Sequence, residues 1–494
     1  MTVSTCEISS STTPTKDGEE LHLSIPAYES ASTNYRLAHR KAIIGDSDFL
    51  AQGELLFIQS RCRHIIRNNP TAAAIRDRHV QQLGAIRVAW ETKEGKKHEL
   101  AQDLWDEFAE NPSIDGKGDL NSFEATQNGD RFESGESLAR MLIVKDGNSA
   151  RIPLKLQGIE SEYLDISYRG DENPEFHNRT FYGITFDKQT LLIPEVYNFF
   201  RNRHYSYINN FVDGNPNQRV QVAAQDVLHT FERCRSGQWR GIPMLASCLI
   251  ALYEIEDLCS ATVRTQTSAS TIAWIISEMN GSTLDPAGRL STLGRNSTND
   301  AVKQLAFDSN GGTVQYTTGK FNLVQSRDIG SNLVNLLQHE YEKIASAVGQ
   351  PYYQVSGNTA DLDFSTIRAL LISLRQRIEF IYSMISIPDF HRPLSKRFKA
   401  ISLALGYQVA DAIPTYQFPR WYGVDDLKDS QADLLEVISG FDTLQNKLKE
   451  RGCTEEQIKE SLDLIKRLGL EGLLTKVPNP SQNNSVPDNQ TSGS

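Results

Sequence analysis

The sequence lacks the patterns by which catalytic sites, leader segments and membrane spans are usually recognised. It contains no G-x-S-x-G, H-E-x-x-H or P-loop motif, and its 10 histidines are scattered along 494 residues. The longest apolar stretch, residues 245–253, is broken by Ser247 and falls far short of the roughly 20 residues that span a bilayer. Residues 1–20 are polar, which predicts no signal peptide. We therefore expect no enzymatic activity, no cofactor and no membrane contact.

Cysteine and positive charge are also scarce. None of the 6 cysteines forms a C-x-x-C pair, and only Cys62 lies near a histidine, His64, with no further ligands placed to join them. This pattern predicts free thiols and no metal site. Acidic residues outnumber basic ones by 62 to 51, which gives a net charge of −11. Such a chain is a poor candidate for gripping nucleic acid through its phosphates, because that requires clustered Lys and Arg.

The segments that are present predict an α+β fold. Alternating apolar residues indicate strands at 85–90, 138–145, 151–156, 181–186, 189–193, 221–224 and 227–232. Helical spacing of apolar residues appears before, between and after these strands. Residues 111–135, rich in Gly, Asp and Asn, are expected to form a loop. The expected sheet is antiparallel, since short connections separate most of the strands.

Residues 349–385 are the stretch around which the chain is organised. One amphipathic helix ends at Gly349, a polar loop follows, and a second helix is expected to begin with Ser365 as its N-cap. We expect Pro388 and Pro393 to close that second helix. Loops held between packed helices often carry function.

Two groups of acidic residues invite a metal-site interpretation. The run from Asp115 to Asn121 fails the calcium-loop spacing at its third and twelfth positions. Asp361 and Asp363 form a second pair of carboxylates on the polar loop. Solvated loop charges are the simpler interpretation, but a metal-dependent hydrolase built on these two residues and loop 111–121 is the rival enzymatic hypothesis.

Several stretches, in a shared order, carry a resemblance to a known family. Residues 67–75 read RNNPTAAAI, residues 104–109 read LWDEFA, and residues 238–244 read QWRGIPM. Asp115-Gly116 and the later Gly135-Glu136 match a D-x-x-G … G-E pattern. The most specific run is YEKIASAVGQPYYQ at 341–354, followed by DFSTIRA at 363–369. With these stretches the chain resembles the lambda-type family of phage portal proteins, although residues 140–220 match in little beyond pattern.

The resemblance implies a portal-protein fold with a wing, stem, clip and helical crown, assembling into a ring. The regions implied are a disordered arm at 1–30, wing at 31–242, stem helix at 243–264, clip at 265–326, stem helix at 327–350, tunnel loop at 351–364, wing helix and strand at 365–423, crown at 424–475 and disordered tail at 476–494. Within the tunnel loop, the residues expected to face DNA are Gln354, Ser356, Asn358, Thr359 and Asp361.

The resemblance also implies partners and a location. The expected assembly is a homo-oligomeric ring of about twelve copies, a dodecamer, at one capsid vertex. Its implied partners are the major capsid protein, the terminase large subunit, a head–tail adaptor and double-stranded DNA moving through the channel during packaging and ejection. The implied location is the virion, with host cytoplasm during assembly. A non-portal virion ring such as an adaptor remains the structural alternative.

Two helix faces are candidate contacts between subunits. They are defined by their apolar residues, Leu333, Leu337 and Tyr341 on one helix and Leu245, Leu249 and Leu252 on the other. Packing inside one chain explains the same spacing equally well.

Overall fold

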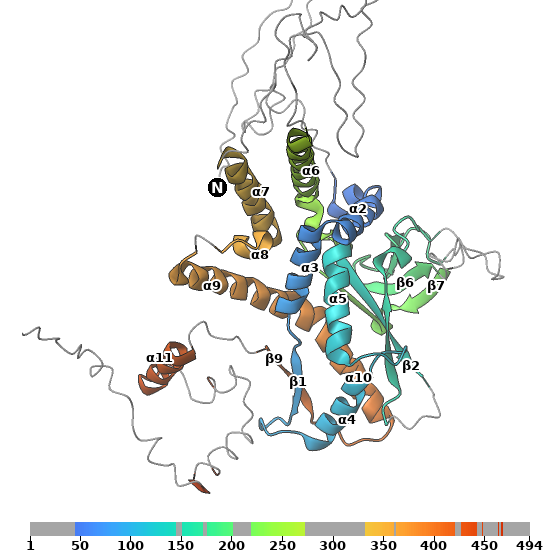
Figure 1. Cartoon of the computed structure of the whole chain (residues 1–494). Coiled ribbons are helices and arrows are strands. Elements are labelled where there is room, and N and C mark those ends of the chain that lie inside the picture. The colour runs from blue at the N-terminus through green and yellow to red at the C-terminus, as the bar shows by residue number, and fades with distance from the viewer. Residues whose placement is uncertain are drawn as a thin grey trace, which may run out of the picture.

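The computed structural model describes residues 45–144, 151–170, 175–200, 219–271, 331–359, 362–419 and 426–441, together with residues 447, 463, 466 and 467 (Figure 1). The arm at 1–30, the tail at 476–494 and nearly all of the predicted clip at 265–326 lie outside these residues, as does most of the predicted crown. Among the described residues, no helix has the length and apolar character needed to cross a membrane.

The N-terminal part of the described chain is helical. Its helices are α1 (Ser47–Gln52), α2 (Leu55–Asn68), α3 (Pro70–Gln82), α4 (Glu99–Glu110) and α5 (Leu120–Ser134). The RNNP run explains the break between α2 and α3. The side chain of Asn69 accepts hydrogen bonds from the backbone N–H groups of Thr71 and Ala72, and Pro70 occupies the first turn, where no N–H is required.

Among the described residues, the strands form three antiparallel sheets, which confirms the predicted α+β class. One sheet has the order β3 (Leu154–Ile159), β2 (Glu136–Ile143), β8 (Val227–Phe231). A second has the order β4 (Thr180–Phe181), β5 (Ile184–Phe186), β6 (Pro194–Phe200), β7 (Arg219–Ala223). In the third, β1 (Arg87–Glu91) pairs with β9 (Ile413–Gln417), which joins segments more than 300 residues apart. Short 3-10 turns lie at η2 (Ser161–Tyr163), η4 (Ala224–Asp226) and η5 (Met244–Ser247).

Two local predictions were wrong. Residues 120–134 are helix α5 and not loop, because Asp119 caps the helix by accepting from the Ser122 N–H and Gly135 ends it in the left-handed conformation. Residues 189–193 are a turn and not a strand. The carboxylate of Asp187 accepts hydrogen bonds from the backbone N–H groups of Gln189, Thr190, Leu192 and Ile193, which folds the chain back on itself.

The prediction that Pro388 and Pro393 close the second helix was also wrong. Helical structure runs without a break through α9 (Phe364–Ile381), the π-helical segment η6 (Tyr382–His391) and α10 (Arg392–Ala404). Pro388 lies inside the π-helical segment, whose wider turn departs from the ladder that a proline disrupts, and Pro393 lies in the first turn of α10. The N-cap of α9 is Asp363 and not Ser365, since its carboxylate accepts from the Thr366 N–H.

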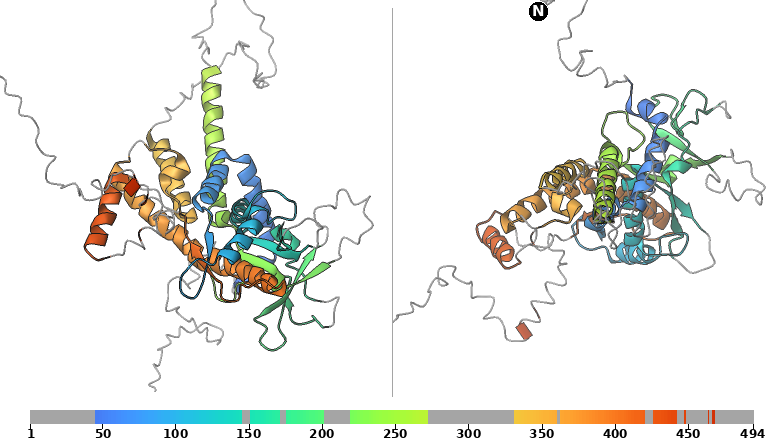
Figure 2. Two further views of the ribbon diagram at one scale, coloured as in Figure 1. Left: turned by 90° about the horizontal axis from the view of Figure 1, so that it is seen from below. Right: turned by 45° about the horizontal axis from the view of Figure 1, so that its top comes forward.

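Helices α6 (Leu249–Thr271) and α7 (Ser331–Val348) extend from the body of the molecule, with the short α8 (Tyr352–Ser356) at the base of α7 (Figures 1 and 2). Helix α11 (Asp426–Ile438) is the last described helix. Leu245, Leu249 and Leu252 are buried with Ile344 and Val348 in one core cluster. The apolar face around Leu252 therefore serves the core of a single chain, and Leu337 and Tyr341 pack partly buried against the same cluster.

The largest core lies at the other end of the molecule from α6 and α7. It combines β1, α4 and α10, and its centre is aromatic. Trp105 meets Phe398 edge to face with ring centroids 5.0 Å apart, and Trp90 contacts both rings. This core fixes β1, β9 and α10 together, so that α9 extends from a firmly packed base (Figure 1).

Candidate functional site

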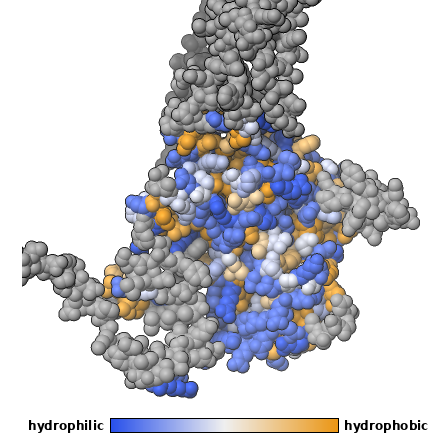
Figure 3. Space-filling model, viewed as in Figure 1, coloured by the Kyte–Doolittle hydropathy of each residue, from blue (hydrophilic) through white to orange (hydrophobic). Residues whose placement is uncertain are grey.

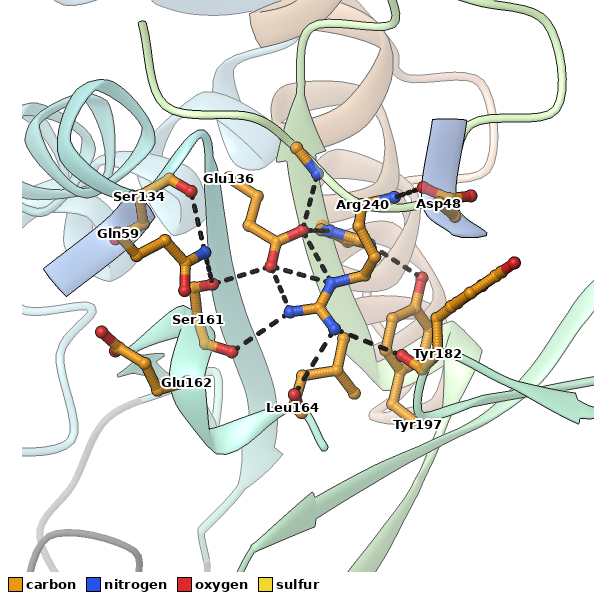
Figure 4. Close-up of polar contacts among 12 residues, drawn as sticks. Asp48, Gln59, Ser134, Glu136, Ser161, Glu162, Leu164, Tyr182, Tyr197 and Arg240 are labelled. Carbon is orange, nitrogen blue, oxygen red and sulfur yellow. Dashed lines mark hydrogen bonds and ion pairs between the residues drawn. The ribbon is translucent and has the colours of Figure 1, made fainter. Parts of the chain in front are cut away.

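Two of the stretches that carry the family resemblance meet in the centre of the chain. Gly135-Glu136 follows α5 and opens β2, while QWRGIPM leads into η5. Glu136 and Arg240 are both fully buried, and their side chains form an ion pair with Arg240 Nη2 2.6 Å from Glu136 Oε1 (Figure 4). We call this pair and its hydrogen-bonding partners the Glu136–Arg240 cluster.

The carboxylate of Glu136 is surrounded by donors. Besides Arg240, it accepts from the Gly241 N–H at 2.9 Å, from Ser161 Oγ at 2.7 Å and pairs with His229 Nε2 at 3.1 Å. Burial opposes ionisation of Glu136, but the charges of Arg240 and His229 and their hydrogen bonds outweigh it and hold the pKa of the carboxyl below its usual range. The fixed partners therefore keep the Glu136 carboxylate ionised within the body of the chain.

The cluster ties separate elements to one another. Asp48 of α1 accepts from the backbone N–H groups of Trp239 and Arg240 at 2.7 and 3.0 Å. Gln59 of α2 donates to Ser161 Oγ and to the Ser134 carbonyl. The resemblance motifs therefore mark a structural junction. Sequence reasoning identified Glu136 and Arg240 only as parts of motifs, and it missed Asp48, Gln59, Ser161 and His229, which belong to no recognisable spacing.

Backbone packing explains the two glycines of the junction. Gly135 has φ +87°, and a Cβ there would lie 2.2 Å from the backbone carbon of Ile242. A Cβ on Gly241 would lie 2.1 Å from the carbonyl oxygen of Gly135. The two chain segments thus cross in direct backbone contact, which no side chain larger than hydrogen permits.

The predicted DNA-facing loop is shorter and better anchored than expected. Gln350 donates from Nε2 to the Ile75 carbonyl at 2.9 Å, Gln82 donates to Gln354 Oε1 at 2.6 Å, and Val355 is buried in the core. Helix α8 is therefore fixed to α3. Gly357 ends α8 with φ +73°, and the connection to α9 begins there.

The five residues predicted to face DNA divide into three groups. Gln354 and Ser356 are half-buried in α8, where Ser356 Oγ donates to the Tyr352 carbonyl. Asn358 and Thr359 are exposed in the connection. Asp361 lies outside the described residues. The structure thus presents Asn358 and Thr359 to solvent between two anchored helices.

The rival metal site is not assembled among the described residues. Asp363 is occupied as the N-cap of α9, and its hydrogen bonds with Thr366 lower the pKa of its carboxyl. Asp115 accepts from Ser113 Oγ and from the Lys117 N–H, and Asp119 caps α5. The beginning of α9 and the loop between α4 and α5 lie at different ends of the molecule (Figure 1). In the part of the chain that is described, no three His, Cys, Asp or Glu side chains gather as metal ligands.

The Cys62/His64 pair does not form a metal site either. Cys62 is a free, buried thiol whose pKa is raised to about 12, mainly by burial, whereas His64 is exposed on the opposite face of α2. Cys248 is also a free and buried thiol, whereas Cys6 and Cys453 lie outside the described residues.

Comparison with family models decides the family. The model described as "Phage portal protein, lambda family" matches residues 36–381, which is well over half of the chain. The chain belongs to the lambda family of phage portal proteins. This match includes both the Glu136–Arg240 cluster of the portal chain and the connection between α8 and α9.

Other comparisons are weaker. A search of curated protein sequences finds no match. Among solved structures, the portal chain is similar to a chain of "Neck of empty GTA particle computed with C6 symmetry" and to one of "Neck of native GTA particle computed with C12 symmetry". Each shows 13% identity, a TM-score of 0.40, and coverage of 84% of this chain and 96% of that chain. A chain of "Virion of native gene transfer agent (GTA) particle" gives the same identity and coverage with a TM-score of 0.38.

Proposed function

We propose that the chain forms a ring at one vertex of a phage head and that double-stranded DNA passes through its centre during packaging and ejection. The observation that carries this proposal is the family match over residues 36–381. In this proposal α6 and α7 are the stem, the segment between them is the clip, and the region after residue 424 is the crown. The terminase, the major capsid protein and a head–tail adaptor dock on the ring.

The surface of α7 and α9 supports the ring proposal. Hydrophobic residues gather over the upper part of the face seen in Figure 3, whereas the lower part is mainly hydrophilic. Val334 and Leu336 on α7, Ile372 and Phe380 on α9, and Met384 in η6 are large, exposed apolar side chains. Ile372 and Phe380 lie on one side of α9, and the buried Leu374 and Ile378 lie on the other. A helix with apolar residues on two sides is expected to bury both, and a neighbouring subunit supplies the second surface.

The connection between α8 and α9 is suited to face a moving polymer. Its ends are fixed by Gln350, Val355 and the Asp363 cap, and its exposed centre offers Asn358 and Thr359 rather than cations. DNA sliding requires weak phosphate contacts, because tight cation–phosphate contacts would stall movement. A ring in which every chain carries a net charge of −11 satisfies this condition.

The decisive experiment measures the assembly of the purified protein by mass photometry, with negative-stain images. We expect particles of about twelve chains with a central hole. A species that remains monomeric or dimeric at every salt and protein concentration would overturn the proposal. Deletion of residues 356–362 then separates a portal from an adaptor ring, because only a portal variant should assemble and yet fail to retain packaged DNA.

A further inference from the structure

Helix α2 has a basic outer face that nothing in the described part of the chain covers. Leu55, Gln59, Cys62 and Ile65 point into the core. On the opposite side, Phe57 is 68% exposed, and Arg61, His64 and Arg67 are exposed beside it. Neither Arg61 nor Arg67 makes an ion pair with any described residue.

Helix α6 has an acidic outer face of similar size. Ile250, which is 73% exposed, is followed at spacings of four and three residues by the exposed Glu254 and Asp257. One side of a helix carries all three, because successive residues are about 100° apart. Glu254 and Asp257 likewise have no ion-pair partner in the described part of the chain.

The two faces cannot satisfy each other within one chain. Glu256, which accepts from Asn69 at the end of α2, marks the side of α6 that meets its own α2. Glu254 is two residues away and therefore points about 200° around the helix from Glu256. The acidic face of α6 is directed away from the basic face of α2 in the same chain.

We propose that α2 of one copy packs its basic face against the acidic face of α6 on the next copy around the ring. This inference rests on the proposed ring. Two different, complementary faces on one chain define a head-to-tail contact, which a rotation repeats until the ring closes. Each face also places one large exposed apolar side chain, Phe57 or Ile250, beside its charges. Opposite charges then select the partner and the register, while the apolar side chains supply buried area.

The test reverses each face separately. Variant A carries Arg61→Glu and Arg67→Glu, and variant B carries Glu254→Arg and Asp257→Arg. Each alone places like charges across every contact of the ring. We expect the protein concentration at half assembly to rise about tenfold or more for each variant. Mass photometry across a dilution series measures this shift.

A mixture of the two variants tests directly whether the α2 and α6 faces contact each other. In a ring that alternates A and B, the reversed α2 face of A meets the reversed α6 face of B, and the remaining contacts are those of wild type. An equimolar mixture should therefore assemble at nearly the wild-type concentration, and so should a single chain carrying all four substitutions. Misfolding of either variant could not produce this rescue.

The control variant carries Lys93→Glu and Lys117→Glu, two exposed positions away from both faces, with the same change in net charge as variant A. It should assemble like wild type. Wild-type rings with no shift in variants A and B would overturn the interface while leaving the ring intact. Loss of assembly without rescue in the mixture would also overturn it, since the two reversed faces would then not contact each other. A wild-type chain that never forms rings would overturn both proposals.

Discussion

The Glu136–Arg240 cluster and the connection between α8 and α9 are both polar, but the polar groups of the cluster are buried and those of the connection are exposed. In the cluster both oxygens of the buried Glu136 carboxylate are engaged, and the carboxylate joins β2, η2, β8 and the segment that leads into η5. In the connection, Asn358 and Thr359 are exposed and are held by local bonds, since the Asn358 N–H donates to Ser356 Oγ and the Thr359 carbonyl accepts from the Leu362 N–H. Polar residues in a motif therefore need not mark the site that contacts a ligand. Here the Gly135-Glu136 and QWRGIPM motifs hold the body together, whereas the most specific run, at 341–354 and 363–369, flanks the connection proposed to meet DNA.

The largest loss of stability should come from a substitution that breaks the Glu136–Arg240 ion pair. Glu136→Ala leaves the buried guanidinium of Arg240 without its partner, which is expected to cost about 3 to 5 kcal/mol of unfolding free energy. Urea denaturation of the dissociated chain measures this loss. The matched control is Glu107→Ala, which removes an ion pair with Arg151 that lies on the surface and should cost less than about 1 kcal/mol. Equal effects at the two sites would contradict the structural role assigned to the cluster.

The backbone crossing is the next target. Gly241→Ala places a Cβ against the Gly135 carbonyl, so the two segments must separate, at an expected cost of about 1 to 3 kcal/mol. Gly53→Ala is the control, because nothing lies within 4 Å of its Cβ position and its φ is −83°. In thermal unfolding, Gly241→Ala should have a lower Tm than wild type, and Gly53→Ala should have the wild-type Tm. A wild-type Tm in that variant would show that the crossing is looser than described.

The next prediction concerns the pH dependence of stability at Asp130, a half-buried residue of α5. Burial, with the charge of Glu133, raises the pKa of Asp130 to about 7 from 3.8. The folded chain therefore binds a proton that the unfolded chain has released, and this contribution to stability is present below pH 4 and lost as pH rises through 7. In Asp130→Asn this loss of stability at higher pH should disappear, because an asparagine side chain does not ionise.

The measurement for Asp130→Asn is urea denaturation at pH 5 and pH 8. Compared with wild type, the variant should gain about 1 to 2 kcal/mol between the two values, because one pKa unit corresponds to about 1.4 kcal/mol and the half-buried site is partly screened. A stability difference from wild type that is the same at both pH values would show that Asp130 is ionised in the folded chain at pH 5.

Local patterns predicted much of this fold, and the failures have physical causes. Alternation located β1, β2, β7 and β8 within a few residues, although β2 and β8 bury residues on both faces. It failed at residues 189–193, where the Asp187 carboxylate organises a turn that propensity does not reveal. The prediction that the prolines end the helix was wrong because a π-helical segment accommodates Pro388. The cluster could be expected only in part: Glu136 and Arg240 lie in motifs, but Gln59 and His229 reach them through contacts that depend on the complete fold.

The smallest effect on stability should occur in the connection between α8 and α9. Thr359→Lys adds a cation at an exposed position whose side chain makes no described hydrogen bond, so the unfolding free energy should change by less than about 0.5 kcal/mol. If the connection faces DNA, a ring of added lysines should bind phosphates and slow packaging, and added salt should relieve the slowing. Gln221→Lys, exposed on β7, adds the same charge away from the connection and should leave packaging unchanged. Equal packaging rates in the two variants, with intact rings, would place Thr359 outside the DNA path.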